Sequence, residues 1–161
     1  MSVKFNTSST RDKYLTMNEE LIKASKIAFS TEFAFYLKAA NFHWNVEGKD
    51  FSQLHELFGT IYEEVYGSID DFAENIRKLG GYTPAAFTRF SALSELDDQV
   101  EVLPAEQMVS VLLEDSDNCV KIFKRIFDMS EESGEHGYSD FIAGRMDAHR
   151  KHSWMLRATT K

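Results

Sequence analysis

Residues 43–58 read HWNVEGKDFSQLHELF, so two histidines twelve residues apart lie on either side of a turn at Gly48. Upstream, residues 10–46 contain neither proline nor glycine and keep apolar side chains at helical spacing, which predicts one long helix. Downstream, residues 51–79 keep the same spacing until a glycine pair ends the pattern. Two long helices joined by a short turn are therefore expected.

Two more long helices are expected in the second half of the chain. A short helix is expected at residues 91–98, and Pro104 suits the first turn of a helix whose apolar stripe covers residues 109–127. A last helix is expected at residues 138–157. No segment has the alternating pattern of a strand, so we predict an all-α four-helix bundle with a short extra helix between its second and third long helices.

Composition limits the class of protein. The chain has 161 residues and 43% hydrophobic content, enough for one domain, which we place at residues 11–161 after a flexible tail at residues 1–10. Thirteen Phe, six Tyr and two Trp favour an oligomer, because such side chains need extensive burial. No apolar run is long enough to span a membrane and the first residues do not look like a signal peptide, so we expect a cytoplasmic protein.

Charge and cysteine content exclude other classes. Cys119 is the single cysteine, which rules out an internal disulfide and any site built from several thiolates, and we expect it to be a small helix-packing residue. The formal net charge of -8 repels phosphate on average and argues against nucleic-acid binding, while it attracts cations.

Two histidines and two carboxylates form two halves of a possible metal site. Asp70 and Glu74 are four residues apart and share a helical face, whereas His43 and His55 flank the turn. A rise of about 1.5 Å per residue puts His55 roughly 22 Å from Asp70 along one helix, too far to share an ion. A twofold axis across two antiparallel helices would join the histidines of one chain to the carboxylates of another. Such donors suit iron or zinc.

A second histidine pair, His149 and His152, also has metal-ligand spacing. The only carboxylate nearby in sequence is Asp147, which lies on a different helical face. We therefore expect these two histidines to be structural.

The motif HWNV-x-G-x-x-F-x-x-LH-x-x-F at residues 43–58, followed by Asp70 and by Ala73-Glu74, closely resembles the signature of Dps proteins, small ferritin-like proteins of starved cells. Residues 149–157 also resemble the end of these proteins. The resemblance covers about residues 15–158.

This resemblance implies a ferritin-like four-helix bundle that assembles into a hollow shell of twelve subunits, built from twofold dimers. It implies oxidation of Fe(II) at the dimer interfaces, preferably with hydrogen peroxide, and storage of ferric mineral inside. His43 and His55 would be ligands from one subunit, and Asp70 and Glu74 ligands from the other. Trp44 would stand beside the site, and zinc could occupy the non-haem iron site. On chemical grounds Trp44 could serve there as a nearby electron donor, and the alternative is that it is a core residue.

The chain departs from the family pattern at Gly59, where an Asp usually follows the second histidine by four residues. Glycine supplies no ligand, so the second metal position is expected to be weaker. The family's shells also have acidic threefold channels through which iron enters, here expected at Glu132, Glu135 and Asp140. Two alternatives stay open: a DNA-compacting architectural protein, and a degenerate shell that sequesters iron with weak oxidation.

Overall fold

The computed structural model describes residues 7–161 and contains five helices in that range, with no strand. The helices are α1 (Thr7–Asn45), α2 (Phe51–Lys78), α3 (Phe87–Leu93), α4 (Ala105–Glu132) and α5 (His136–Ala158). Four of them are long, which confirms the all-α bundle with a short extra helix. None of the described helices is long and apolar enough to cross a membrane.

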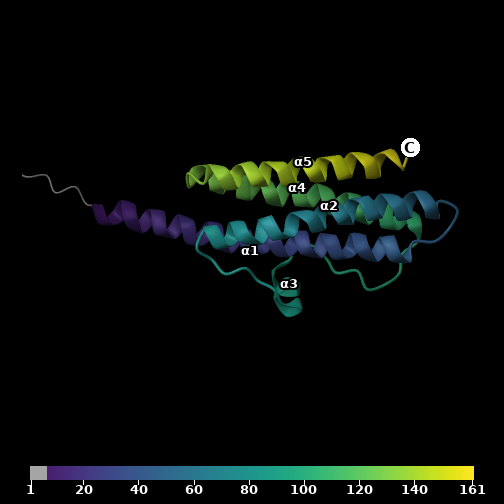
Figure 1. Ribbon diagram of the computed structural model, residues 1–161, viewed down its shortest axis with the longest axis horizontal. Coiled ribbons are helices and arrows are strands. Elements are labelled where there is room, and N and C mark those ends of the chain that lie inside the picture. The colour runs from purple at the N-terminus through teal and green to yellow at the C-terminus, as the bar shows by residue number, and fades with distance from the viewer. Residues whose placement is uncertain (1–6) are drawn as a thin grey trace, which may run out of the picture.

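The long helices form two antiparallel pairs, α1 with α2 and α4 with α5 (Figure 1). A long connection carries the chain from the end of α2 back along the bundle to the start of α4, and α3 lies within this connection against α1 (Figure 1). The α1–α2 turn and the end of α5 therefore lie at the same end of the molecule. One long crossover of this kind is typical of ferritin-like bundles.

Two predicted boundaries are wrong. The first helix begins at Thr7, so residues 7–10 of the expected tail are helical, while residues 1–6 lie outside the described residues. Adding a turn to an existing helix costs little where no Pro or Gly intervenes. The short helix lies at Phe87–Leu93 instead of 91–98 because Phe90 stacks on Phe33 of α1, with ring centroids 4.3 Å apart. Tertiary packing, rather than local propensity, places it.

Aromatic rings hold the long helices together. The Phe72 ring of α2 is fully buried and makes edge contacts with Phe29 of α1, Phe123 of α4 and Phe141 of α5, at centroid distances of 5.6, 5.9 and 5.4 Å. Edge-to-face pairs contribute about 0.5–1.5 kcal/mol each beyond the area they bury. This packing fixes which face of α2 points into the bundle and therefore which faces carry its polar side chains.

Candidate metal centre

His43 and His55 lie against each other across the α1–α2 turn. The Nδ1 atom of each ring lies 2.6 Å from the backbone carbonyl oxygen of the other residue, and the ring centroids are 3.7 Å apart. Because a carbonyl oxygen only accepts hydrogen bonds, both Nδ1 atoms carry the proton. The Nδ1–H contacts leave Nε2 of each ring as the atom available to a metal ion, as outer hydrogen bonds do for metal-binding histidines.

The turn itself brings the rings together. Gly48 adopts a φ of +113°, a left-handed conformation that favours glycine, and the Phe51 N–H donates to the Gly48 carbonyl at 3.1 Å. Asp50 occupies the N-cap position of α2 but makes no side-chain capping bond. The Phe51 ring stacks on His55 at 5.0 Å, and Tyr62 meets the edge of His43 at 5.1 Å. Aromatic neighbours therefore restrict both imidazoles.

Gly59 is part of this packing. A Cβ atom built at this position would lie 2.9 Å from Nδ1 and 3.0 Å from Cε1 of His43, distances that real Cβ atoms hardly ever show. The absence of a side chain lets the His43 ring lie against α2. The residue that removes a carboxylate from the site thus also makes room for an imidazole.

The acidic half of the candidate site lies near the other end of α2. Asp70, Asp71 and Glu74 are exposed, and each offers an oxygen within 4.8 Å of the others. Asp71 was missed in the sequence because adjacent helical residues point about 100° apart. Within one chain the structure brings together the two histidines, and separately the carboxylates, but α2 runs without a break between the two groups. Trp44 follows His43 directly and is 63% exposed.

The expected channel residues lie around the α4–α5 connection. Glu132, Glu135 and Asp140 are exposed. Glu131, in contrast, accepts hydrogen bonds from Ser139 and His136, which lower the pKa of its carboxyl. Glu131 thus holds the start of α5 in place, whereas the other three carboxylates make no ion pair within residues 7–161.

A polar network crosses the core at mid-bundle. The fully buried Glu32 of α1 accepts hydrogen bonds from Arg145 and from Nε2 of His149, at 2.5 and 2.8 Å. Glu64 of α2 accepts from Arg145 and from Nε2 of His152, at 2.6 and 2.8 Å. The expectation that Asp147 is the only carboxylate near these histidines is therefore wrong. Carboxylates from two other helices reach them.

The network fixes protonation states. Burial alone would raise the pKa of Glu32, but the charges of His149 and Arg145 outweigh it and hold that pKa below its ordinary value. Burial likewise opposes ionisation of Glu64, yet hydrogen bonds from His152 and Arg145 lower its pKa to about 2. Burial lowers the pKa of His152 despite its bond to Glu64. Two carboxylates and one guanidinium are thus charged inside the bundle.

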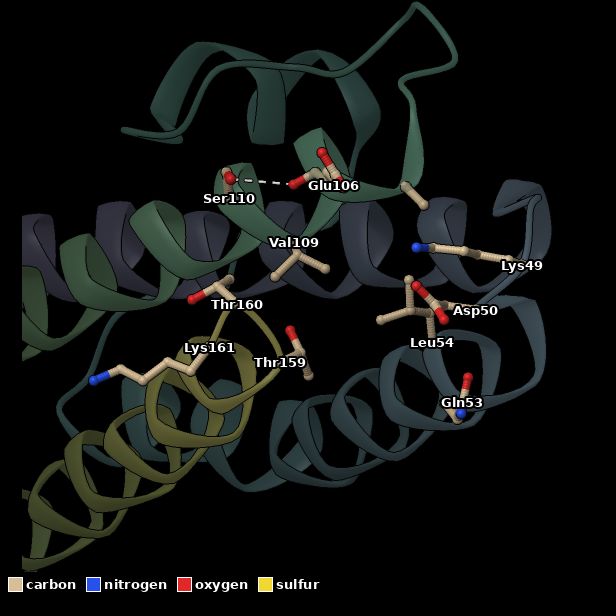
Figure 2. Close-up of a pocket in the computed structure, with 11 residues that line it drawn as sticks. Lys49, Asp50, Gln53, Leu54, Glu106, Val109, Ser110, Thr159, Thr160 and Lys161 are labelled. Atoms are coloured by element: carbon tan, nitrogen blue, oxygen red, sulfur yellow. Dashed lines mark hydrogen bonds between the residues drawn. The ribbon is translucent and has the colours of Figure 1, made fainter.

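A cavity of about 700 Å³ does not coincide with any of these groups. It lies between the α1–α2 turn, the start of α4 and the end of α5 (Figure 2). Lys49 and Lys161 line it together with Asp50 and Glu106, so opposite charges balance around it (Figure 2). None of the four predicted metal ligands contributes to its wall. The candidate metal ligands therefore lie outside this cavity.

Comparison with known proteins identifies the family to which this fold belongs. Residues 26–161 match the Ferritin family, a ferritin-like domain. The DNA protection during starvation protein 2 of Bacillus anthracis is 30% identical over 142 residues, which are 88% of this chain and 97% of that protein. The crystal structure of a Dps protein from Bacillus brevis has a TM-score of 0.87 and 27% identity, covering 91% of this chain and 98% of that one.

A Dps protein from Vibrio cholerae O1 has the same fold, with a TM-score of 0.86 at 24% identity over 91% of this chain and 92% of that one. That protein is described as a member of a broad superfamily of ferritin-like diiron-carboxylate proteins. The family match covers most of the chain, and the relative from Bacillus anthracis spans nearly its whole length. The chain therefore belongs to the Dps family of ferritin-like proteins.

Proposed function

We propose that two chains build two equivalent metal sites across a twofold axis, each with His43 and His55 of one subunit facing Asp70 and Glu74 of its partner. The observation that carries this proposal is the division of the donors into two incomplete sets at opposite ends of α2, one imidazole pair and one carboxylate group. Antiparallel packing of two α2 helices joins complementary sets, and twofold symmetry then gives two sites per dimer.

The proposed reaction is oxidation of ferrous iron. Two ferrous ions each give one electron to one hydrogen peroxide, whose O–O bond breaks to leave two hydroxide ions. Non-haem iron is thus both the substrate and the cargo. His43 and His55 bind through Nε2, and the partner's carboxylates neutralise the charge of the ions. Zinc prefers the same donors and would compete for the site.

Assembly into a shell is part of the proposal. Large apolar side chains are exposed on the single chain, among them Tyr66 at 61%, Phe87 at 81% and Trp154 at 63%. Burial of these rings between subunits would contribute to a stable oligomer. We infer a shell of twelve subunits in the cytoplasm that stores ferric mineral inside. Glu132, Glu135 and Asp140 would line the channels through which iron enters.

Gly59 defines the weaker part of the site. The histidine half offers two imidazoles and no carboxylate, so one of the two metal positions depends mainly on the partner's Asp70 and Glu74. A weakly held second ion would slow the transfer of both electrons to one peroxide. Trp44, beside His43 in sequence and exposed on the single chain, would then donate the missing electron.

Stopped-flow oxidation of ferrous iron tests this function, with peroxide and with oxygen as separate oxidants. We expect faster oxidation with peroxide, and we expect the His43→Ala/His55→Ala variant to lose at least about tenfold in rate. Slow oxidation of iron by wild-type protein with either oxidant, despite tight binding, would instead favour the degenerate, iron-sequestering shell.

DNA compaction is the other alternative. The formal net charge of -8 gives it no support, since DNA binding depends on neutralising phosphates with Lys and Arg. A gel shift at low salt tests it directly, and we expect no retardation.

A further inference from the structure

We propose that Glu32, Cys119 and His149 form a second, intrasubunit metal site in the bundle core, which takes a thiophilic divalent cation such as zinc. The three residues come from α1, α4 and α5 and are all fully buried. One carboxylate oxygen, the thiol sulfur and one imidazole nitrogen lie within 4.8 Å of one another. This site shares no residue with the intersubunit site.

The groups around this trio already hold its donors in place. Nδ1 of His149 lies 3.2 Å from Oγ of Ser116, which leaves Nε2 as the atom that faces Glu32. Arg145 donates twice to Oε1 of Glu32, at 2.5 and 3.1 Å, so Oε2 is the oxygen that faces His149. Metal-binding histidines and carboxylates in proteins are oriented by outer hydrogen bonds of this kind.

The distance between the imidazole nitrogen and the carboxylate oxygen requires little rearrangement. Nε2 of His149 and Oε2 of Glu32 are 2.8 Å apart. Around a tetrahedral zinc ion, ligands at about 2.0–2.1 Å leave the nitrogen and oxygen roughly 3.3 Å apart. The nitrogen and the oxygen would therefore have to move apart by about half an ångström to admit the ion. Small side-chain adjustments are enough for a movement of this size.

The charge balance allows a divalent ion. The charges of His149 and Arg145 oppose those of Glu32 and Glu64 in the buried cluster. A divalent cation that replaces one proton of charged His149 and the proton of the Cys119 thiol leaves the total charge of this cluster unchanged. Without a cation, burial and the nearby Glu32 raise the pKa of the Cys119 thiol well above its ordinary value, so the thiol stays protonated.

The donor set selects the kind of metal. A thiolate with one imidazole and one carboxylate suits zinc or cadmium better than magnesium or calcium, which prefer oxygen ligands. Complete burial leaves no route for a substrate, so the ion would be structural: it would join three helices of the bundle.

Refolding and assembly of the full chain with a graded amount of cadmium tests the site, because the buried donors are accessible before the helices pack and cadmium bound to a thiolate has an ultraviolet charge-transfer band. Cys119 is the single cysteine, so any such band reports this residue. The His43→Ala/His55→Ala variant serves as background, since it removes the intersubunit site. We expect this variant to show the band with one sulfur-bound cadmium per chain, and Cys119→Ala to lose the band and that ion while keeping its helical circular dichroism.

The roles of Glu32 and His149 as ligands are tested in the same His43→Ala/His55→Ala variant. X-ray absorption should show one sulfur with nitrogen and oxygen neighbours around cadmium, and this measurement needs no variant that could fail to fold. Ser116→Ala should weaken cadmium binding by about 10–100-fold, as loss of a group that orients a ligand does. Absence of the band in protein refolded and assembled with cadmium, or a sulfur ligand without nitrogen neighbours, would overturn the proposal. Loss of iron oxidation in the background variant has no bearing on this outcome.

Discussion

His43 and His55 hold each other in place: the ring Nδ1 of each lies 2.6 Å from the carbonyl oxygen of the other. The two backbone carbonyls belong to the last turn of α1 and the second turn of α2, so the end of one helix and the start of the next orient one another's imidazole. The pair is therefore organised before any metal arrives. Its geometry depends on the turn at Gly48 and on the absence of a side chain at Gly59, against which the His43 ring lies.

Substitution of Gly59 tests this dependence. Gly59→Ala would place a Cβ 2.9 Å from His43 Nδ1, so we expect it to displace the imidazole, lower the melting temperature and weaken metal binding. Gly144→Ala is the matched control on α5, because its Cβ would meet nothing within 4 Å. Alanine should stabilise the control by about 0.5–1 kcal/mol. Thermal unfolding measures the melting temperature of both variants. An equal change in the two melting temperatures would contradict the proposed role of Gly59.

Mixing of variants tests whether each site is shared. His43→Ala/His55→Ala and Asp70→Asn/Glu74→Gln chains should each lose iron oxidation. When they are unfolded together and reassembled, a mixed dimer puts both defects in one site and leaves the other intact. Random pairing should then restore about a quarter of the wild-type sites. Measured activity of the mixture that equals the sum of the separate variants would show that each site lies within one chain.

Acid should unfold the bundle partly through its buried network. Burial opposes the charged form of His152 and lowers its pKa, so stability is lost as the pH falls below the ordinary histidine value of 6.5. Glu64 has a folded pKa of about 2 against an ordinary 4.5, so its contribution is present above pH 4.5 and is lost towards pH 2.

Glu64→Gln checks this assignment. Urea unfolding across this pH range should show a shallower loss of stability for the variant below pH 4.5 than for wild-type protein. An exposed carboxylate with no ion pair, Glu135, supplies the control, and Glu135→Gln should follow the wild-type curve. Identical slopes for all three proteins would exclude Glu64 as a source of acid sensitivity.

Neutralisation of the proposed channel should slow the arrival of iron. We expect Glu132→Gln/Glu135→Gln/Asp140→Asn to lower the initial rate of ferrous oxidation and to reduce its dependence on salt, because a negative lining attracts cations. Neutralising the exposed carboxylates Asp12, Glu19 and Glu20 on α1 changes the net charge equally. An equal loss of rate in both triple variants would mean that net charge, rather than the channel, guides iron.

Much of this architecture could be predicted from local patterns. Apolar spacing and glycine positions predicted the four long helices to within a few residues, and the turn at Gly48 predicted that His43 and His55 would meet. The start of α1 and the position of α3 were less accurate, because an unpacked helix end and the Phe90–Phe33 contact leave no periodic signal in sequence.

The core network had no signal of this kind. Glu32 and His149 are separated by 117 residues, and their contact depends on the packing of α1 against the second helix pair. Glu32 stands alone among apolar residues of its helix, and this was the one feature of the sequence that could have indicated the network. A fully buried carboxylate needs a partner. Asp71 was missed for a different reason: helical geometry places it off the face that Asp70 and Glu74 share, yet its side chain reaches them.

The shared metal site is tested most directly by anomalous scattering from crystals of the assembled protein soaked with ferrous or zinc ions. The account predicts an anomalous peak between Nε2 of His43 and His55 of one subunit and the carboxylates of Asp70 and Glu74 of its twofold partner. A well-ordered ion elsewhere with these four side chains unoccupied, or paired subunits that keep the two sets far apart, would contradict it.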